Sequence, residues 1–293
     1  MRIHEWDVLQ LLKNKLIEAA ETKGLKLTDC DFGSKRWNAS KKRVFYLWKI
    51  ENNLFERPSP STVLGTGAEA VRSSAAMIYN LLGENELVLD GKTYSSIEYE
   101  KQFPAIKDEG SKKHNAHLDA VFLSSDKSEM YAIEAKLLEW KDSPKNLAAA
   151  YLKKAMYFPA NPESKVFIDF FKSLIDLKLD ANGRYKHNKK RYDAIQMIIH
   201  TLGLYNHFAE MKTPQVKKLT LLNVVWKYEC DEYEIEENEA AQFLDDANKV
   251  FSPLFKRIGI DFSIQYSTFQ AFKDKLTFAK DSNRLEYLKR YLV

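Results

Sequence analysis

Apolar residues recur at steps of three and four along several stretches of the chain, the spacing that places them on one face of a helix. The clearest stretch spans residues 62–82, which Gly83 follows as a stop signal. We predict the other helices over residues 5–22, 147–157, 159–179, 191–211 and 237–258, with two further helices closing the chain.

Other stretches have the pattern of strands. Residues 218–228 (KLTLLNVVWKY) form a nearly continuous apolar run rich in β-branched and aromatic side chains, which is typical of a strand buried on both faces. The remaining predicted strands cover residues 93–103, 117–124, 129–138 and 260–266. The order helix, three strands, helix, strand predicts a mixed α/β layer architecture.

The composition is that of an ordinary globular protein. The chain has 293 residues, 45% of them hydrophobic and 29% charged. It contains no run of eighteen apolar residues, so we expect no membrane span. The N-terminal stretch carries acids among its apolar residues, unlike a signal peptide. Cys30 and Cys230 are too few for a cysteine metal cluster, although one disulfide is open to them. We therefore expect a cytoplasmic protein.

The two strands over residues 117–124 and 129–138 carry the candidate chemistry. A turn centred between Asp126 and Lys127 would oppose residues whose numbers add up to 253, which sets Asp119 directly across from Glu134. Lys136 lies two residues beyond Glu134 and shares its face of the strand. We therefore predict that the three charged groups converge.

Two carboxylates facing each other among apolar neighbours need a positive partner. Lys136 supplies one charge, and a divalent cation is the natural second. Mg²⁺ takes oxygen ligands and commonly uses one or two carboxylates together with water and substrate phosphate. The alternative is a buried ion pair of Lys136 with one acid, which leaves the second acid unexplained.

This arrangement resembles the PD-(D/E)XK phosphodiesterase superfamily, in which an acid on one core strand precedes a (D/E)-x-K triplet on the next. The matching residues are Asp119 and Glu134-Ala135-Lys136. Glu69, on the predicted helix 62–82, fits the additional acid of that family's first core helix. The resemblance covers roughly residues 62 to 228. It departs from the family pattern at Leu118, which stands where the motif has proline.

The resemblance implies a nuclease. Mg²⁺, with Mn²⁺ as a substitute, would be held by Asp119, Glu134 and the carbonyl of Ala135, and would activate a water to hydrolyse a phosphodiester. Lys136 would assist the attacking water. Glu69 would support the metal, and Gln196 would stand beside the site from the helix 191–211.

The resemblance also implies a restriction-endonuclease-like fold, in which helices flank a mixed sheet. Residues 62–228 would form this nuclease core. Residues 1–61 would form a helical and basic N-terminal extension, and residues 229–293 a helical C-terminal addition packed on the core.

Positive charge gathers in two segments. Residues 34–49 hold six Lys or Arg and residues 183–191 hold five, and neither segment contains an acid. Such a surface suits a polyanion. We expect nucleic acid as the partner, with DNA favoured over RNA, and we expect no membrane contact. A homodimer is left open. The residues assigned to backbone contacts are Lys41, Lys42, Arg43, Lys189, Lys190 and Arg191.

Several side chains have plainer interpretations. We expect His200 and His207 to lie on the solvated side of the helix 191–211, and Glu98 and Glu100 to lie on the surface of an edge strand. His114 and His117 have HxxH spacing but no third ligand nearby, which argues against zinc. Two other functions remain open: a catalytically silent binding module on the same fold, and a metal enzyme for a small phosphorylated substrate.

Overall fold

The fold is described from a computed structural model. It describes residues 74–83, 86–108, 110, 113–137, 144–159, 161–211, 213–227, 231–277 and 288, together with scattered helical positions from 11 to 21. Those helical positions agree with the helix expected over residues 5–22. Glu69 and the basic residues Lys41, Lys42 and Arg43 lie outside the described residues.

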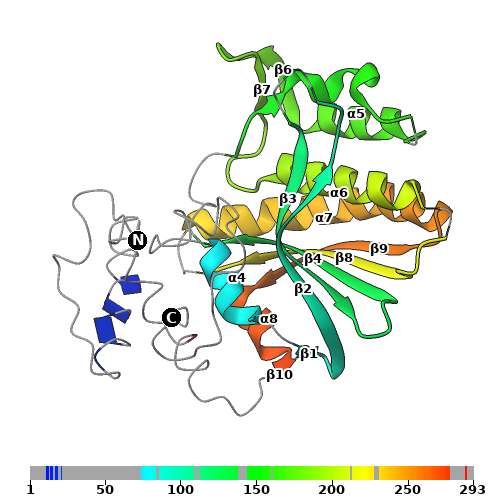
Figure 1. The fold of residues 1–293 in the computed structure, drawn as a ribbon. Coiled ribbons are helices and arrows are strands. Elements are labelled where there is room, and N and C mark those ends of the chain that lie inside the picture. Colours follow the sequence, from blue (N-terminus) through cyan, green and yellow to red (C-terminus); the bar gives the residue numbers. More distant parts are fainter. Residues whose placement is uncertain are drawn as a thin grey trace.

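A mixed seven-stranded sheet forms the centre of the fold (Figure 1). Its strands follow the order β10-β1-β2-β3-β4-β8-β9. Neighbours from β10 to β4 are antiparallel, whereas β4, β8 and β9 run parallel to one another. The bounds are β1 (Leu87–Leu89), β2 (Lys92–Pro104), β3 (Asn115–Ser124), β4 (Glu129–Lys136), β8 (Lys218–Val225), β9 (Asp261–Thr268) and β10 (Leu276–Thr277).

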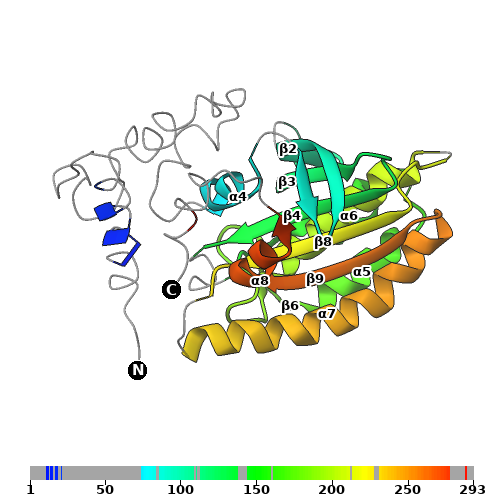
Figure 2. The ribbon, with the colours of Figure 1, turned by 90° about the horizontal axis from the view of Figure 1, so that it is seen from below.

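Helices cover both faces of this sheet (Figures 1 and 2). The short helices α4 (Ser74–Leu82) and α8 (Phe269–Asp274) lie on one face, and α6 (Ala194–Ala209) and α7 (Asp231–Arg257) lie on the other. The mixed α/β class predicted from the sequence is confirmed. No helix in the described part of the chain is both long enough and apolar enough to cross a membrane.

Strand residues alternate between two hydrophobic clusters, one on each face. The cluster beneath α4 and α8 includes Met77, Ile78, Phe122, Ile133, Ala135, Leu222, Val224, Phe269 and Phe272. The cluster beneath α6 and α7 includes Val121, Ala132, Ile198, Leu202, Leu221, Phe243, Phe251 and Ile264.

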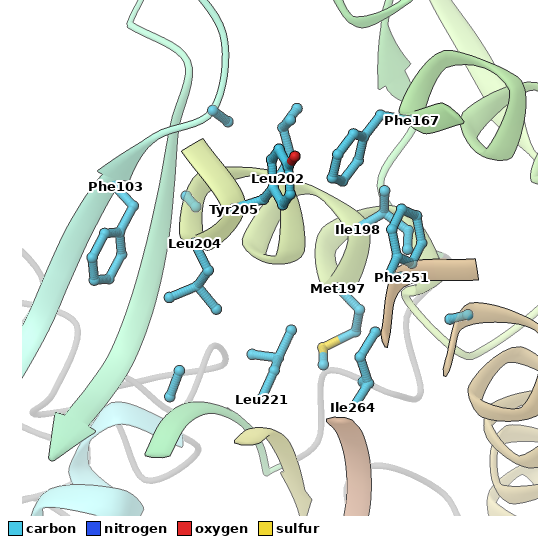
Figure 3. Packing of buried hydrophobic residues seen from close by; sticks show 14 of the residues in the cluster. Phe103, Phe167, Met197, Ile198, Leu202, Leu204, Tyr205, Leu221, Phe251 and Ile264 are labelled. Carbon is cyan, nitrogen blue, oxygen red and sulfur yellow. The ribbon is translucent and has the colours of Figure 1, made fainter. Parts of the chain in front are cut away.

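Helix α6 is buried along most of its length. Figure 3 shows Leu204 and Met197 directed toward the sheet residues Leu221 and Ile264, and Tyr205 directed toward Phe167. Its Gly203 lies against β2 and β3, where a Cβ atom would stand 2.8 Å from the Cβ of Ala116 and 3.1 Å from the carbonyl oxygen of Phe103. Glycine therefore lets α6 approach these two strands more closely than any other residue would.

A second, three-stranded sheet separates β4 from α6 along the chain and stands away from the main sheet (Figure 1). The sequence predicted helices over residues 147–157 and 159–179 and a basic loop over residues 183–191. Only the middle of the second range is helical. The elements are β5 (Leu147–Ala148), the 3-10 turns η3 (Ala149–Leu152) and η4 (Lys154–Met156), α5 (Ser164–Ser173), β6 (Ile175–Leu179) and β7 (Arg184–His187).

Local hydrogen bonds explain these differences. The Asp180 carboxylate accepts the backbone N–H groups of Asn182 and Arg184, which closes a tight turn and pairs β6 with β7. The Tyr157 hydroxyl donates to the carbonyl of Tyr151, whose oxygen a regular helix would use for its own ladder.

The chain after residue 228 is more than a helical addition. It contributes β9, which pairs with β8, and β10, which pairs with β1, so it completes both edges of the main sheet. Phe243 and Phe251 of α7 also share one cluster with Ile198 and Leu202 of α6. The C-terminal segment expected to pack on the core is therefore part of it.

We predict that Gly203→Ala destabilises the protein by about 1–3 kcal/mol because the added Cβ overpacks the contact with Ala116 and Phe103. In an unconstrained helix the same change stabilises the protein by up to about 1 kcal/mol. The sign of the change in unfolding free energy therefore distinguishes the two cases. Urea unfolding measures it. Adding Ala116→Gly removes the nearest opposing atom, and the double variant should lose less stability than the two single changes together. Additive losses would contradict the contact.

Candidate active site

Strands β3 and β4 separate at one point in the sheet. Their paired residues run from Leu123 and Met130 to Ala120 and Ile133, and every pair has numbers that add up to 253. The predicted register is confirmed for these four pairs, and the pairing ends one residue before Asp119 and Glu134. Beyond this point β3 continues beside β2, and β4 continues beside β8 as far as Lys136. We call this divergence the strand fork.

Asp119 occupies the strand fork. One carboxylate oxygen accepts the backbone N–H of Ala135 at 2.6 Å. Because the N–H and C=O of one strand residue point to the same side, the carbonyl of Ala135 also faces β3. The side chain of Asp119 thus takes the place of a ladder hydrogen bond and bridges the two strands where they diverge.

The three predicted residues share the α6 face of the sheet. Val121 and Ala132, two residues from Asp119 and Glu134, belong to the cluster beneath α6 and α7. Side chains alternate along a strand, so Asp119, Glu134 and Lys136 continue these rows on the same face. Along both β3 and β4, the side chains on this face change from apolar to charged at the strand fork.

Glu134 is buried and ionised. Its side chain is 5% exposed, and its two oxygens contact Lys136 Nζ at 2.6 Å and His200 Nε2 at 2.9 Å. Burial alone would raise the pKa of this carboxyl, but the Lys136 charge and the His200 contact lower its pKa to about 2. The carboxylate is therefore charged at neutral pH.

Lys136 and Gln196 contact each other as expected. The ammonium of Lys136 donates to Gln196 Oε1 at 2.7 Å, and its side chain is 16% exposed. The backbone N–H of Gln196 donates to Asp193, the N-cap of α6, which fixes the first turn of the helix. Gln196 and Glu134 thus both hold the Lys136 ammonium.

His200 does not lie on a solvated face, so that prediction is wrong. It is 2% exposed and contacts Glu134, while its Nδ1 has no partner among the described residues. The polar positions of α6 face the charged end of the sheet, which explains both their spacing and their burial. His207 is half-buried, with its ring 5.1 Å from that of Phe103.

Glu100 also faces the strand fork. It lies between the pairs Tyr99–Ala120 and Lys101–Leu118, so it stands opposite Asp119, and its φ of 52° is left-handed. Its Oε1 is buried and has no partner among the described residues. Burial, followed by the charge of Glu134, raises the pKa of Glu100 to about 7. A surface position on an edge strand was expected, but β2 lies between β1 and β3 and the side chain of Glu100 is partly buried.

Negative charge therefore exceeds positive charge at the strand fork. Burial and the charge of Glu134 also raise the pKa of Asp119, although the Ala135 N–H and Lys136 oppose the shift. Three carboxyl groups compete for the positive charge of one lysine. This competition favours a cation, or retained protons, beside Asp119 and Glu100.

On the neighbouring strands β8 and β9, Asn223 and Tyr266 continue the line of paired polar residues that begins at Glu134. Glu134 pairs with Asn223, and Asn223 pairs with Tyr266. The side-chain amide of Asn223 donates to the carbonyl of Glu134 at 3.1 Å, and the Tyr266 hydroxyl contacts Glu236 Oε2 at 2.7 Å. Sequence reasoning missed both residues, although a lone asparagine within an apolar strand was the available signal.

The oxygen donors at the strand fork suit a hard cation such as Mg²⁺, which needs only one or two carboxylates besides water and phosphate oxygens. Within the described ranges, no three His, Cys, Asp or Glu side chains form a group that could by itself hold a metal ion. Glu134 is engaged by Lys136 and His200, and Asp119 by Ala135. His114 packs against Tyr151, and His117 is exposed on β3, two residues before Asp119.

The basic residues 189–191 lie directly before α6. The backbone N–H groups of Lys190, Arg191 and Tyr192 all donate to the carboxylate of Glu239 on α7, at 2.9 to 3.1 Å. A pocket of about 500 Å³ opens beside them. It is lined by Pro144, Asn146, Asp176, Lys186, His187, Asn188, Lys189, Lys190, Arg191 and Ile235. Only Tyr192 and Asp193 separate these basic residues from α6 along the chain.

Comparison with family models, curated proteins and solved structures finds no match to this chain. The function must therefore be inferred from the side chains at the strand fork and from the surfaces around it.

We predict that the contribution of Glu100 to the stability of the metal-free protein falls as pH rises from about 4.5 to 7, because this group has a raised pKa in the folded state and ionises there beside Glu134. The stabilising contribution of Glu100 is complete at pH values below its pKa in the unfolded chain. It is lost as the pH rises through the pKa of Glu100 in the folded protein. Glu100→Gln should therefore raise the melting temperature at pH 8 by a few degrees and leave it nearly unchanged at pH 4.

The matched control is Glu98→Gln, two residues away on β2, where the carboxylate is exposed and bonds Lys101. Its pH profile should follow that of the parent protein. Thermal unfolding in EDTA across the pH range tests both variants. A Glu100→Gln variant that melts below the parent at pH 8 would contradict the assignment.

Proposed function

We propose that this protein is a metal-dependent nuclease that hydrolyses phosphodiester bonds at the strand fork. The observation that carries the proposal is the gathering of Asp119, Glu134 and Lys136 where β3 and β4 separate, through the contacts of Asp119 with Ala135 and of Lys136 with Glu134. An acid-rich site with one lysine suits the handling of a phosphate and a cation together.

Asp119 and Glu134 would hold Mg²⁺, or Mn²⁺ in its place, and the Ala135 carbonyl at the same strand fork would be a third oxygen ligand. When bound, the ion supplies charge for the scissile phosphate and lowers the pKa of an attacking water. Glu100 adds a further carboxylate opposite Asp119. It occupies, from β2, the supporting role that the sequence assigned to Glu69.

Lys136 is the group that would act on the water. Gln196 and Glu134 hold its ammonium between them, so its position is fixed before any substrate arrives. From there it would orient the attacking water and offset charge that develops on the phosphate. His200 would position Glu134, because it contacts the second oxygen of that carboxylate.

The order of elements supports the same proposal. Helix α4, strands β2 to β4, helix α6 and strand β8 follow one another as in the PD-(D/E)XK core, with the acid on β3 and the E-x-K triplet on β4. We accordingly propose a restriction-endonuclease-like fold for this part of the chain. The small sheet is an insertion between the triplet strand and α6.

Nucleic acid is the proposed substrate, with DNA favoured. Lys186, Lys189, Lys190 and Arg191 line one pocket, which contains a single acid, Asp176. Cations grouped beside a phosphate-handling site bind a polyanionic backbone. A small phosphorylated substrate would use only one such group, so the extent of the basic surface favours a polymer.

Asp119→Asn tests the catalytic proposal. The amide keeps an oxygen for the Ala135 N–H and relieves repulsion with Glu134, so the fold and its metal-free stability should hold. Cleavage of mixed DNA and RNA in Mg²⁺ should fall by about a thousandfold. Calorimetric titration should also show weaker Mn²⁺ binding. Cleavage by the parent protein that persists in EDTA would contradict the proposal.

Replacing Lys189, Lys190 and Arg191 with alanine should weaken nucleic-acid binding and flatten its dependence on salt by roughly one unit of log–log slope per lost phosphate contact. The backbone N–H groups that contact Glu239 remain, so the loop should keep its shape. Mn²⁺ affinity should not change.

The matched control removes three exposed lysines elsewhere, Lys165, Lys172 and Lys249, each of which pairs with an aspartate. Binding in Ca²⁺ across a salt series compares the two triple variants with the parent protein. Equal slopes for the parent and the first variant would show that the basic loop makes no phosphate contact.

A further inference from the structure

The hairpin of β6 and β7 projects from the small sheet, away from the main sheet (Figure 1). β6 is an edge strand that pairs with β7, and its burial falls from Ile175, which is buried, to four exposed residues. Its pairing with β7 is irregular. Between the pairs Ile175–His187 and Leu179–Tyr185, β6 has three residues where β7 has one, so β6 bulges outward.

The bulge exposes aliphatic side chains. Leu177, in its middle, is 70% exposed and Leu179 is 54% exposed, more than any other large hydrophobic residue among those described. A strand that only completed a small sheet would carry polar groups at such positions. Two leucines held outward on a projecting hairpin therefore indicate a contact surface.

The charge around these leucines is positive. Residues 175–191 contain six Lys or Arg and two acids, Asp176 and Asp180. The Asp180 carboxylate is already engaged by the turn and by the side-chain amide of Asn146. Lys178 and Arg184 are exposed on the hairpin, and Lys186 continues into the basic pocket at its base. The partner that this charge complements is a polyanion.

The shape and chemistry favour a duplex over a single strand. A two-stranded β-ribbon fits a groove of a duplex, and leucine is one of the apolar wedges that unstack base steps between flanking cations. Single strands are bound instead on aromatic platforms, and the hairpin strands carry one aromatic residue, the half-buried Tyr185.

We propose that the β6–β7 hairpin enters a groove of the duplex substrate, with Leu177 and Leu179 as an apolar wedge and Lys178, Arg184 and Lys186 against the phosphates. This inference rests on the proposed nuclease function and names its substrate as double-stranded nucleic acid. Lys186 belongs both to the hairpin and to the basic pocket, so one duplex would contact the hairpin and the pocket at its base.

The test is the double variant Leu177→Ser and Leu179→Ser, compared with Met211→Ser, which alters an exposed hydrophobic residue just after α6. The probes are a short DNA duplex that carries 2-aminopurine and the matching single strand, both in Ca²⁺. The double variant should bind the duplex about tenfold more weakly and bind the single strand like the parent. The salt slope should not change, because no charge is removed, and the 2-aminopurine signal of unstacking should be lost.

The outcomes separate the two levels of the proposal. If the parent cleaves DNA and the double variant binds the duplex as the parent does, the hairpin inference fails and the nuclease function stands. If the parent neither binds nor cleaves nucleic acid, the function fails and the inference falls with it. A parent dimer that the double variant dissociates, with duplex affinity unchanged, would assign the leucines to a second copy of the chain and overturn the inference.

Discussion

The burial of an ionised Glu134 is the constraint on which the geometry of the site depends. A carboxylate that is 5% exposed is tolerated only with charged or hydrogen-bonding partners, and here both oxygens have one. Lys136 comes from the same strand, but His200 comes from α6, so the helix must lie close to the sheet. Gly203, one turn after His200, allows that approach because it carries no Cβ against Ala116. The charge on β4 and the glycine in α6 are thus parts of one arrangement.

The same charge determines the state of its neighbours. Glu134 holds the lysine and the histidine, so little positive charge remains for Asp119 and Glu100, and the pKa of each is raised. Three ionised carboxylates and one lysine leave two negative charges, which one divalent cation would balance. Where β3 diverges from β4, Asp119 rather than a ladder bond bridges the strands.

Much of this arrangement could be predicted from the sequence because strand registers follow simple geometry. A symmetric polar turn fixed the pairing of β3 with β4, and alternation then placed Asp119, Glu134 and Lys136 on one face. The position of Gln196 beside the site was implied by the resemblance to the PD-(D/E)XK superfamily. His200 and Glu100 could not be placed in this way, because their burial depends on which elements pack against them. Spacing shows that His200 shares a helix face with Gln196, but only the packing of α6 on the sheet shows that this face is buried.

The small sheet escaped prediction for a related reason. Its strands are short, and the turn of Asp180 and the bulge of β6 determine its shape more than any apolar period does. Its connection to the site is specific nonetheless. Glu239 binds three successive backbone N–H groups just before Asp193 caps α6. One carboxylate therefore fixes both the end of the basic loop and the start of the helix that carries Gln196 and His200. The basic loop and the residues that hold Lys136 and Glu134 are therefore anchored next to each other along the chain.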